Sequence, residues 1–297
     1  MTKARLAILP DRGVVSVKGA DARDFLDNLV TNDMALLDGQ EAIHAALLSP
    51  QGKILFEFFV VKTPAGYLLE TALDQTAALA KRLALYKLRA KVDVADAAGE
   101  VVVVASQGGV RARPTTAIAF VDPRCEGLGD RVLIPAPLVG ETIAAMGAPR
   151  MTPDTYTLNR IRLGIPEAGR DYPLGDTFPH DADFDVFNGV SFTKGCFVGQ
   201  EVVARMQNKT VVRKRVVGIT GDGELANGAE LKVGEATIGT VGSAVGGEAL
   251  AMLRLDRALE ATDKGQVISA DGVTVTVDPV MLAQYRASVA EKAAEQA

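Results

Sequence analysis

The sequence predicts an α+β protein, and two patterns lead to this class. Short runs of β-branched and apolar residues, at 14–17, 54–61 and 101–104, are typical of strands. Amphipathic helical patterns at 21–29 and 74–89 interrupt these runs, without the regular alternation that a doubly wound parallel sheet requires. The chain of 297 residues is long enough for two or three domains, and its 48% hydrophobic content is typical of a globular protein.

Three helices are expected in the first 165 residues. Asp21 suits the N-cap of the first helix. The second helix places Leu79, Leu83 and Tyr86 on one apolar face, with basic residues elsewhere. A third is expected over 154–163, because a proline directly precedes it and prolines favour the first turn of a helix.

The second half of the chain has a different texture. Residues 165–185 are rich in Pro, Gly and Asp and are too long for a simple connector, which indicates a functional loop. From residue 211 onward, short strands separated by glycines predict a small β-barrel of about eighty residues. We therefore expect three parts: an α+β region of one or two subdomains over 1–208, a C-terminal β-barrel over 209–285, and a terminal tail over 286–297.

Composition restricts the classes of function. The net charge of −5 and the pI of about 5.3 argue against direct, nonspecific binding of nucleic acid. The first residues contain no apolar run of the kind that a secretory signal needs, and no run reaches the roughly 18 apolar residues of a membrane span. The two cysteines lie far apart and indicate no disulfide framework. We expect a cytoplasmic monomer without membrane contact.

Two possible metal sites can be set aside. Asp181, Asp183 and Asp185 have the spacing that opens a calcium loop, but Val186 and Phe192 stand where such a loop needs Gly and Glu. A solvated acidic turn is the expected structure there.

The only two histidines, His44 and His180, do not pair with a cysteine at zinc spacing, so a closed structural zinc site is not expected. A cysteine–histidine nucleophile pair remains open.

A basic run, RKR, begins at Arg213 and follows Arg205 and Lys209. On a strand, Arg213 and Arg215 would share one face. The run is either a solvated strand edge, kept soluble by its charge, or an anion site in which arginines bind a carboxylate or phosphate.

The octapeptide KGCFVGQE places Cys196 in an unusual setting. Gly195 and Gly199 permit a tight backbone path, and helical spacing follows, so Cys196 is expected just before a helix N-terminus. Lys194 stands two residues before it. A helix N-terminus and a nearby cation both favour the thiolate, the form that attacks electrophiles and binds metals. The alternative is a small apolar cysteine packed in the core. Cys125 has no comparable setting.

This octapeptide, followed by RKRVVG, resembles the signature of the YgfZ-type family of folate-binding, iron–sulfur-cluster-related proteins. Mitochondrial iron–sulfur assembly relatives share that signature. The segments VKGADARDFLDNLVTNDMALL, LLSPQGKILFEFFVV, YKLRAKVDV and RIRLGIPEAGRD also resemble the family, in its order, so that the resemblance covers residues 5–285. The family is similar in fold to the T-protein of the glycine cleavage system, a tetrahydrofolate-dependent aminomethyltransferase. The resemblance therefore implies a T-protein-like folate-binding fold with a C-terminal β-barrel.

The resemblance also implies roles for particular residues. Cys196 becomes the functional cysteine, with Lys194 tuning its thiolate. The motif and turn residues are Gly195, Phe197, Gly199, Gln200 and Glu201, of which the last two would order the turn and cap the helix. Glu167 falls near the glutamate with which the T-protein contacts its pterin. The residues expected to bind tetrahydrofolate, or another folate, are Glu167, Asn32, Asp33, Tyr86, Arg89, Arg205 and Arg213.

One departure bears on the chemistry. Phe56 and Glu57 stand where the T-protein has paired aspartates, one of them catalytic, and Phe56 cannot ionise. Aminomethyl transfer as the T-protein performs it is therefore not expected.

The resulting hypothesis is a folate-binding accessory protein for the assembly or repair of iron–sulfur clusters, chiefly four-iron ones, in client enzymes. Effects on tRNA modification would be indirect. A cluster normally needs four thiolates, and the chain has two cysteines, so Cys196 would share a transient cluster with a partner such as an A-type carrier protein. One alternative is a tetrahydrofolate-dependent one-carbon transferase that uses Glu57 or Asp33 as its acid–base group. Another is an interaction module in which Cys196 is only structural. Whether the protein is an enzyme stays open at this stage.

Overall fold

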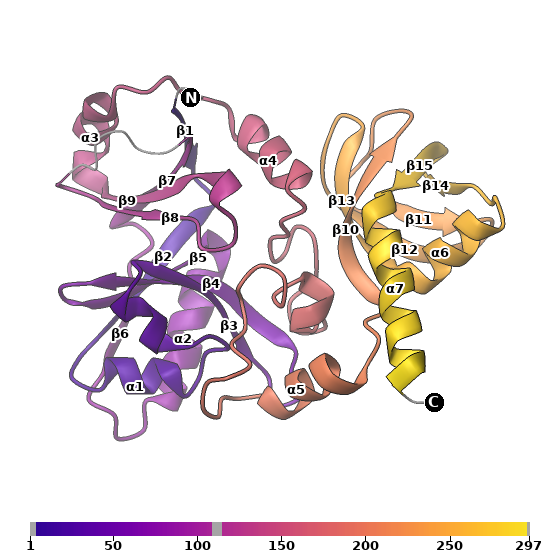
Figure 1. Cartoon of the computed structure of the whole chain (residues 1–297). Coiled ribbons are helices and arrows are strands. Elements are labelled where there is room, and N and C mark those ends of the chain that lie inside the picture. Colours follow the sequence, from indigo (N-terminus) through magenta and orange to yellow (C-terminus); the bar gives the residue numbers. More distant parts are fainter. Residues whose placement is uncertain (1–3, 109–114, 296–297) are drawn as a thin grey trace. The chain divides into compact units, whose positions relative to one another are not determined.

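The computed structural model describes residues 4–108 and 115–295 and divides the chain into two compact units (Figure 1). The first unit consists of Met1–Tyr156 and Asp185–Gln200, and the second of Thr157–Phe184 and Glu201–Ala297. The chain passes from one unit to the other after residues 156, 184 and 200. The sequence predicted that the first region would end at residue 208. In the structure, residues 157–184 and 201–208 belong instead to the second unit, together with the barrel.

The first unit contains two antiparallel sheets and several short helices. One sheet has the strand order β3-β4-β5-β2-β6, and the other has the order β1-β7-β9-β8. The elements up to the second sheet's first hairpin are β1 (Arg5–Leu9), β2 (Arg12–Lys18), α1 (Ala22–Asp27), η1 (Met34–Asp38), β3 (Ala42–Leu48), β4 (Ile54–Thr63), β5 (Gly66–Ala72), η2 (Leu73–Gln75), α2 (Thr76–Tyr86), β6 (Asp93–Asp96) and β7 (Val101–Gln107). They are followed by β8 (Ile118–Val121), η3 (Glu126–Leu128), β9 (Asp130–Pro135), η4 (Ala136–Leu138), α3 (Val139–Met146) and the start of α4 (Pro153–Arg162).

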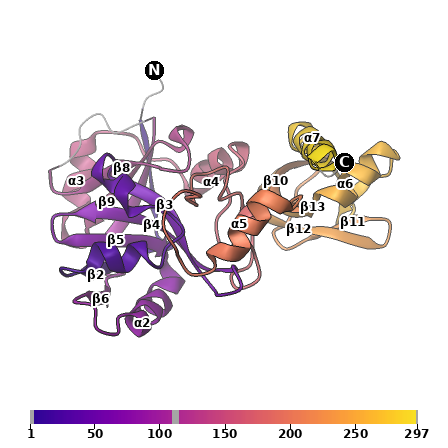
Figure 2. The same cartoon turned by 60° about the horizontal axis from the view of Figure 1, so that its bottom comes forward.

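The main core of this unit lies on one face of the five-stranded sheet. Alternate residues of each strand point to this face, as the period of two in β4 requires: Phe56, Phe58 and Val60 belong to the core. Leu79 and Leu83 of α2 cover them, and α2 packs against β2 and β6 (Figure 2). The apolar pattern at 54–61 is thus confirmed as a strand.

The opposite face of the five-stranded sheet carries buried charges that meet the four-stranded sheet. Arg131 of β9 is fully buried and lies 3.3 Å from the Glu70 carboxylate of β5, and it donates to the Tyr156 hydroxyl at 2.7 Å. The Arg131 guanidinium carbon also lies 5.2 Å from the centre of the Phe59 ring. Asp122 joins the same network through Arg131 and through two side-chain bonds and one backbone bond from Arg124. These pairs neutralise charges that would otherwise be very costly to bury, although Glu70 Oε2 has no hydrogen-bond partner among the described residues.

The second unit is built around a closed barrel, β10-β13-β12-β11-β14-β15, whose interior is filled by apolar side chains. Closure leaves no strand edge open. The elements are η5 (Pro179–Ala182), α5 (Gln200–Lys209), β10 (Lys214–Gly221), β11 (Glu230–Val233), β12 (Ala236–Val245), β13 (Glu248–Arg254), α6 (Leu255–Asp263), β14 (Ile268–Ala270), β15 (Val273–Val277) and α7 (Pro279–Glu295). The expected barrel is confirmed. Helices α6 and α7 pack against each other beside it (Figure 2).

Several local expectations need correction. Asp21 stands at the N-cap of α1, but its side chain makes no capping bond there; its carboxylate accepts the Lys91 backbone N–H at 2.7 Å instead. Helix α2 ends at Tyr86 rather than at residue 89. Among the residues described, no helix combines the length and apolarity needed to cross a membrane.

Candidate functional site

Cys196 lies in the first unit, on the loop of residues 191–199 that leads into α5. Its side chain is exposed. The next residue, Phe197, is buried, and Val198 packs against the main core of the unit. The loop is therefore fixed by apolar side chains on one side of the thiol while the thiol itself faces solvent. The interpretation of Cys196 as a packed core cysteine is wrong.

Lys194 fixes the loop on the other side of the thiol. Its side chain is only 1% exposed, and its ammonium donates to the backbone carbonyls of Asp27, Val30 (3.1 Å) and Asn32 (2.9 Å). The Asp27 carboxylate lies 3.1 Å away. Burial lowers the pKa of Lys194, and the nearby Asp27 carboxylate partly offsets this effect. Lys194 thus binds the oxygens at the C-terminal end of α1, and its expected influence on the Cys196 thiolate stays a prediction.

The two glycines of the octapeptide have different reasons to be glycine. Gly199 has a φ of +82°, and a Cβ there would lie 2.7 Å from the Ser49 carbonyl oxygen and 3.0 Å from Gly52 Cα. Its conformation and its close approach to the β3–β4 hairpin both exclude a side chain. At Gly195, a Cβ would meet no described atom within 4 Å. Packing therefore does not explain Gly195, which stands directly beside the exposed thiol.

The segment before the loop is tied to β3 by buried side chains. The Thr31 hydroxyl donates to the Gly189 carbonyl at 2.6 Å and accepts the Ala46 N–H at 2.9 Å. Asn32 donates both amide hydrogens, to the carbonyls of His44 (2.9 Å) and Asn188 (2.7 Å). The chain leading to Cys196 is thereby held to the five-stranded sheet.

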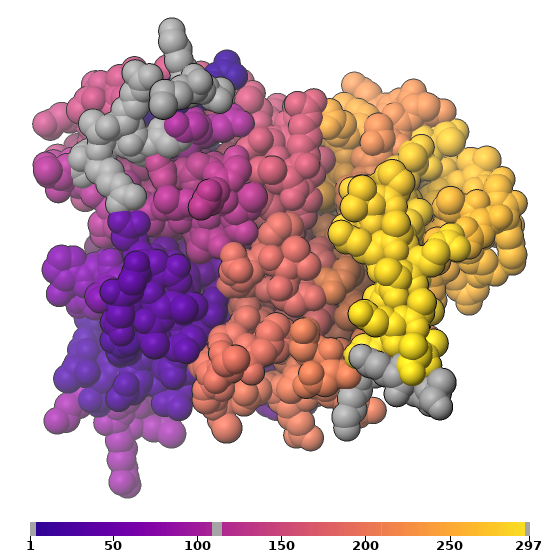
Figure 3. All heavy atoms as spheres, viewed as in Figure 1, coloured from indigo at the N-terminus to yellow at the C-terminus, as the bar shows by residue number. Residues whose placement is uncertain are grey.

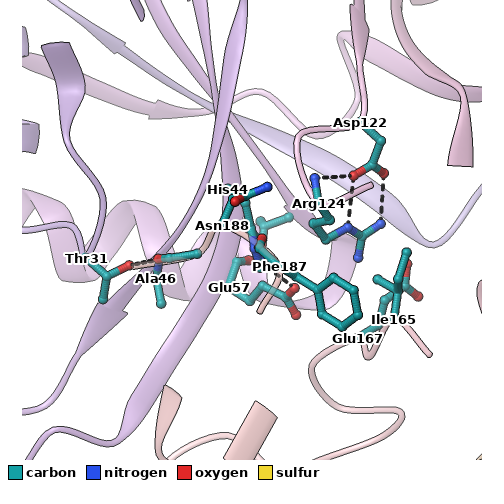
Figure 4. A network of polar contacts seen from close by, with 12 residues as sticks. Thr31, His44, Ala46, Glu57, Asp122, Arg124, Ile165, Glu167, Phe187 and Asn188 are labelled. Atoms are coloured by element: carbon teal, nitrogen blue, oxygen red, sulfur yellow. Dashed lines mark hydrogen bonds and ion pairs between the residues drawn. The ribbon is translucent and has the colours of Figure 1, made fainter. Parts of the chain in front are cut away.

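A buried acid–base pair lies beneath this segment (Figure 4). His44 Nε2 is 3.0 Å from Glu57 Oε1, and His44 Nδ1 is 3.1 Å from the Phe187 carbonyl oxygen. Because a carbonyl oxygen can only accept, a hydrogen bond at Nδ1 requires a proton on that nitrogen, and a hydrogen bond at Nε2 requires a further proton on the ring or on the carboxyl group. Glu57 and Phe56 point to opposite faces of β4, so that Phe56 belongs to the core. Sequence reasoning missed the role of His44, although the hairpin pairing of 42–48 with 54–61 contains the signal: the two side chains are diagonal neighbours.

The other residues expected to bind folate fall in both units. In the first unit, Asn32 also accepts the Asp33 N–H with its side-chain oxygen, and Asp33 caps η1 by accepting the Ala35 N–H at 2.8 Å. Tyr86 packs against the main core, and Arg89 is exposed. These contacts give Asn32 and Asp33 structural partners inside the chain.

In the second unit, Glu167 is buried and its carboxylate lies 3.6 Å from Arg160 Nε. Arg160 is fully buried; it donates to the Ile165 carbonyl and to Asp171, each at 2.6 Å. Asp171 in turn accepts the Ser243 N–H of β12, so this cluster holds the 165–171 loop to the barrel. Within the second unit the Glu167 carboxylate is thus engaged with an arginine, and its expected contact with a pterin stays a prediction.

Arg215 of the basic run pairs with one residue of the acidic triplet inside the second unit. Arg215 donates to Asp183 at 2.7 Å and to the His180 carbonyl at 2.8 Å. Asp181 and Asp183 are buried, so the expected solvated acidic turn is wrong. Arg213 is exposed and precedes β10, which begins at Lys214. The pairing of Arg215 means that it does not share an anion site with Arg213.

Two motif residues, Gln200 and Glu201, lie on α5, and the second cysteine, Cys125, lies elsewhere in the first unit. Gln200 begins α5, and its N–H bonds the Phe197 carbonyl at 3.2 Å. Glu201 and Arg205 line a shallow hollow of roughly 460 Å³ on this helix. Cys125 is half-buried and lines a pocket of roughly 660 Å³ in the first unit.

The chain has the fold of the aminomethyltransferase class with a C-terminal β-barrel. Glycine cleavage system aminomethyltransferase T from Bartonella henselae aligns with a TM-score of 0.73, over 93% of this chain and 85% of that one. The identity is 17%, so this likeness establishes the fold alone. Residues 213–282 match the family model described as CAF17, C-terminal beta-barrel domain. The α+β, T-protein-like fold expected from the sequence is confirmed.

The curated relatives narrow the class further. The iron-sulfur cluster assembly factor IBA57 homolog, mitochondrial, of Mycosarcoma maydis is 35% identical over 231 residues, which are 73% of this chain and 57% of that protein. The human iron-sulfur cluster assembly factor IBA57, mitochondrial, is 31% identical over 240 residues, 70% of this chain and 64% of that protein. The chain thus spans a little over half of the Mycosarcoma relative. The YgfZ-type resemblance is confirmed in its broader form, a likeness to iron–sulfur cluster assembly factors.

These names also correct the expected location. The relatives from Mycosarcoma maydis, Neurospora crassa and human are all named as mitochondrial proteins. A cytoplasmic location, inferred from the composition and the N-terminal residues, is contradicted by this finding.

Proposed function

We propose that this protein is an accessory factor for the assembly of iron–sulfur clusters, chiefly four-iron ones, and that Cys196 binds cluster iron together with a partner protein. The observation that carries the proposal is the setting of the thiol: Cys196 is exposed, while carbonyl oxygens after α1 hold Lys194, the main core holds Val198 and the β3–β4 hairpin closely contacts Gly199. A ligand positioned by rigid neighbours can bind iron with little loss of conformational freedom. The names of the curated relatives support this function.

The cysteine count supports a shared cluster. Thiolates are the usual ligands of iron–sulfur clusters, and four are normally needed. The chain has two cysteines, and only Cys196 is exposed among the described residues. We infer that a partner, an A-type carrier protein, supplies the other ligands and that the cluster is cargo which passes on to client enzymes. Any effect on tRNA modification would follow indirectly from those enzymes.

The test is an anaerobic titration with an A-type carrier that holds a two-iron cluster. Visible absorption and the mass of the complex are followed for the wild type, for Cys196→Ser and for the matched control Cys125→Ser. We expect a cluster-bearing complex with the wild type and Cys125→Ser, and its loss with Cys196→Ser. A complex that forms equally well with Cys196→Ser would refute the ligand role.

Folate binding is a separate proposal that rests on the fold. Because Asn32 and Glu167 are engaged within the chain, recognition of a pterin would require those contacts to open, and no step of the cluster role depends on it. Calorimetric titration with tetrahydrofolate tests it directly. The expected result is saturable binding that Glu167→Gln weakens; no heat of binding would refute the proposal.

A tetrahydrofolate-dependent one-carbon transferase is the second candidate, and the His44–Glu57 pair is the observation that favours it. Glu57 stands where the sequence resemblance places one of the T-protein's paired aspartates, and its carboxylate lies 3.0 Å from His44 Nε2, within reach for proton exchange. Anaerobic turnover with tetrahydrofolate and simple methylated amines, in wild type and in Glu57→Gln, tests this candidate. Product that is lost with Glu57→Gln but still forms with Cys196→Ser would favour the transferase.

A further inference from the structure

The region around α2 differs in charge from the rest of the molecule. The chain as a whole has a net charge of −5, but residues 75–92 contain five basic residues and no acidic one. The basic residues are Lys81, Arg82, Lys87, Arg89 and Lys91. Within the part of the chain that the structure describes, none of these five side chains forms an ion pair. Their charge is therefore not neutralised inside the first unit.

Two leucines lie among these cations with unusual exposure. Leu85, on the last turn of α2, is 66% exposed, and Leu88, just after the helix, is 91% exposed. A single exposed apolar residue is common on protein surfaces, but two of them framed by unpaired charges are typical of a contact surface. We name Lys81, Arg82, Leu85, Leu88 and Arg89 the basic leucine patch.

The backbone holds Leu88 outward. Its φ of +42° lies in the left-handed region, which a branched or bulky side chain rarely adopts. The turn is fixed on both sides, because Lys87 N–H bonds the Ala84 carbonyl at 3.3 Å and Ala90 N–H bonds the Lys87 carbonyl at 2.7 Å. Figure 3 shows the purple-magenta segment after α2 as a projection from the surface of the first unit. Unfavourable backbone geometry that exposes an apolar side chain indicates a use outside the fold.

Helix α2 and the cysteine loop pack against the same core cluster of the first unit. Leu79 and Leu83, on the buried face of α2, pack in the same core cluster against which Val198 of the cysteine loop lies. That cluster covers one face of the five-stranded sheet. A protein that contacted α2 would therefore dock on the same unit that carries Cys196.

We propose that the basic leucine patch is the docking surface for the protein that shares a cluster with Cys196, and that this partner presents an acidic surface with an apolar socket for Leu85 and Leu88. The proposal rests on the proposed function. Unpaired Lys and Arg side chains attract an acidic partner and speed the encounter, and desolvated leucines add affinity at the centre of the contact.

A membrane or a nucleic acid fits these observations less well. An interfacial membrane helix lays its apolar face on the lipid, whereas α2 buries its apolar face in the core. Single-stranded nucleic acid is usually bound by stacking on aromatic side chains, and the patch contains none. An acidic protein surface is the occupant that both the charges and the leucines suit.

The experiment measures the affinity of the full chain for a metal-free A-type carrier by fluorescence anisotropy, at low and at raised ionic strength. Two variants alter the patch: Lys81→Glu with Arg82→Glu, and Leu88→Asn, which keeps a residue that tolerates the left-handed region. The matched control reverses the same number of charges elsewhere on the first unit, at the exposed residues Arg5 and Lys18. Circular dichroism checks that every variant is folded.

We expect each patch variant to weaken binding by about tenfold or more, and the control by less than about twofold. Raised ionic strength should weaken the wild type more than the charge-reversed variant, and Cys196→Ser should dock normally because no cluster is present. Patch variants that bind as the wild type does would overturn the docking proposal and leave the cluster role of Cys196 intact. Wild type that binds vesicles containing phosphatidylserine, through the patch, but not the carrier would also overturn it. No wild-type complex at either ionic strength would overturn it too, and the separate cluster titration then decides the proposed function.

Discussion

Replacing each glycine of the octapeptide by alanine separates the fold of the cysteine loop from its function. At Gly199 the added methyl would lie 2.7 Å from the Ser49 carbonyl oxygen and 3.1 Å from Leu48 Cβ, and the residue has a φ of +82°. The left-handed conformation costs an L-residue about 1–2 kcal/mol. Forcing a methyl into packed backbone costs about 1–3 kcal/mol more. We therefore expect Gly199→Ala to lower the free energy of unfolding by about 2–5 kcal/mol.

Gly195→Ala is the matched control, because a Cβ at that position meets no described atom. Its effect on stability should stay within about 0.5 kcal/mol. The assay is urea denaturation followed by far-ultraviolet circular dichroism, since the chain has no tryptophan for fluorescence. We expect the midpoint of Gly199→Ala to fall by about 1 M or more and that of Gly195→Ala to stay near the wild type. Equal midpoints for the two variants would refute the argument that backbone packing requires Gly199.

Two further predictions concern buried charges. Lys194→Met should lower the free energy of unfolding by about 2–3 kcal/mol, because the oxygens around the ammonium lose a charged donor. The measurement is the thermal midpoint of unfolding. The control is Lys62→Met, which should lower that midpoint much less because the Lys62 side chain is half-exposed. An unchanged midpoint for Lys194→Met would contradict the role assigned to its bonds. Burial raises the pKa of Asp122, but Arg124 and Arg131 outweigh it and hold that pKa below its usual value. The resulting stability is present above about pH 4 and is lost as the pH falls further. Asp122→Asn should thus flatten the acid limb of a stability–pH curve, and an unaltered limb would count against the pairing.

The fold could be predicted where a segment's own pattern decides its structure. The period of two in 54–61 identifies β4 because every second side chain enters one core. Short strands punctuated by glycines identify the barrel for the same reason. The strand β14, Ile268–Ala270, was missed because three residues are too few to show a period. Helix α6 was missed as well. The division into units was also missed, because the packing of 157–184 with the barrel depends on long-range bonds such as those of Arg160 and Asp171.

In the candidate site too, contacts between residues far apart in the sequence could not be predicted. The octapeptide indicated an important cysteine, and its exposure agrees with a functional one. The partners of Lys194 could not be read from the sequence, because they lie at least 162 residues earlier in the chain. The local sequence suggested a cation beside a thiol, whereas the tertiary structure gives that cation to the carbonyl oxygens after α1. The residues expected to bind folate show the same limit. The sequence segments that resemble the folate-binding family are present, but Asn32 and Glu167 have partners within the chain that only the folded structure reveals.

The path of the chain between its units has a consequence for how the protein can be made. The first unit is not complete at residue 156, because it also needs residues 185–200, and these follow a stretch that belongs to the second unit. During synthesis, the core against which Val198 packs lacks this final segment until the ribosome has passed residue 200. A fragment that ends at residue 156 would lack both the thiol and the lysine that fixes its loop. Cys196 can therefore take its place in the first unit only after residues 157–184, which belong to the second unit, have been made.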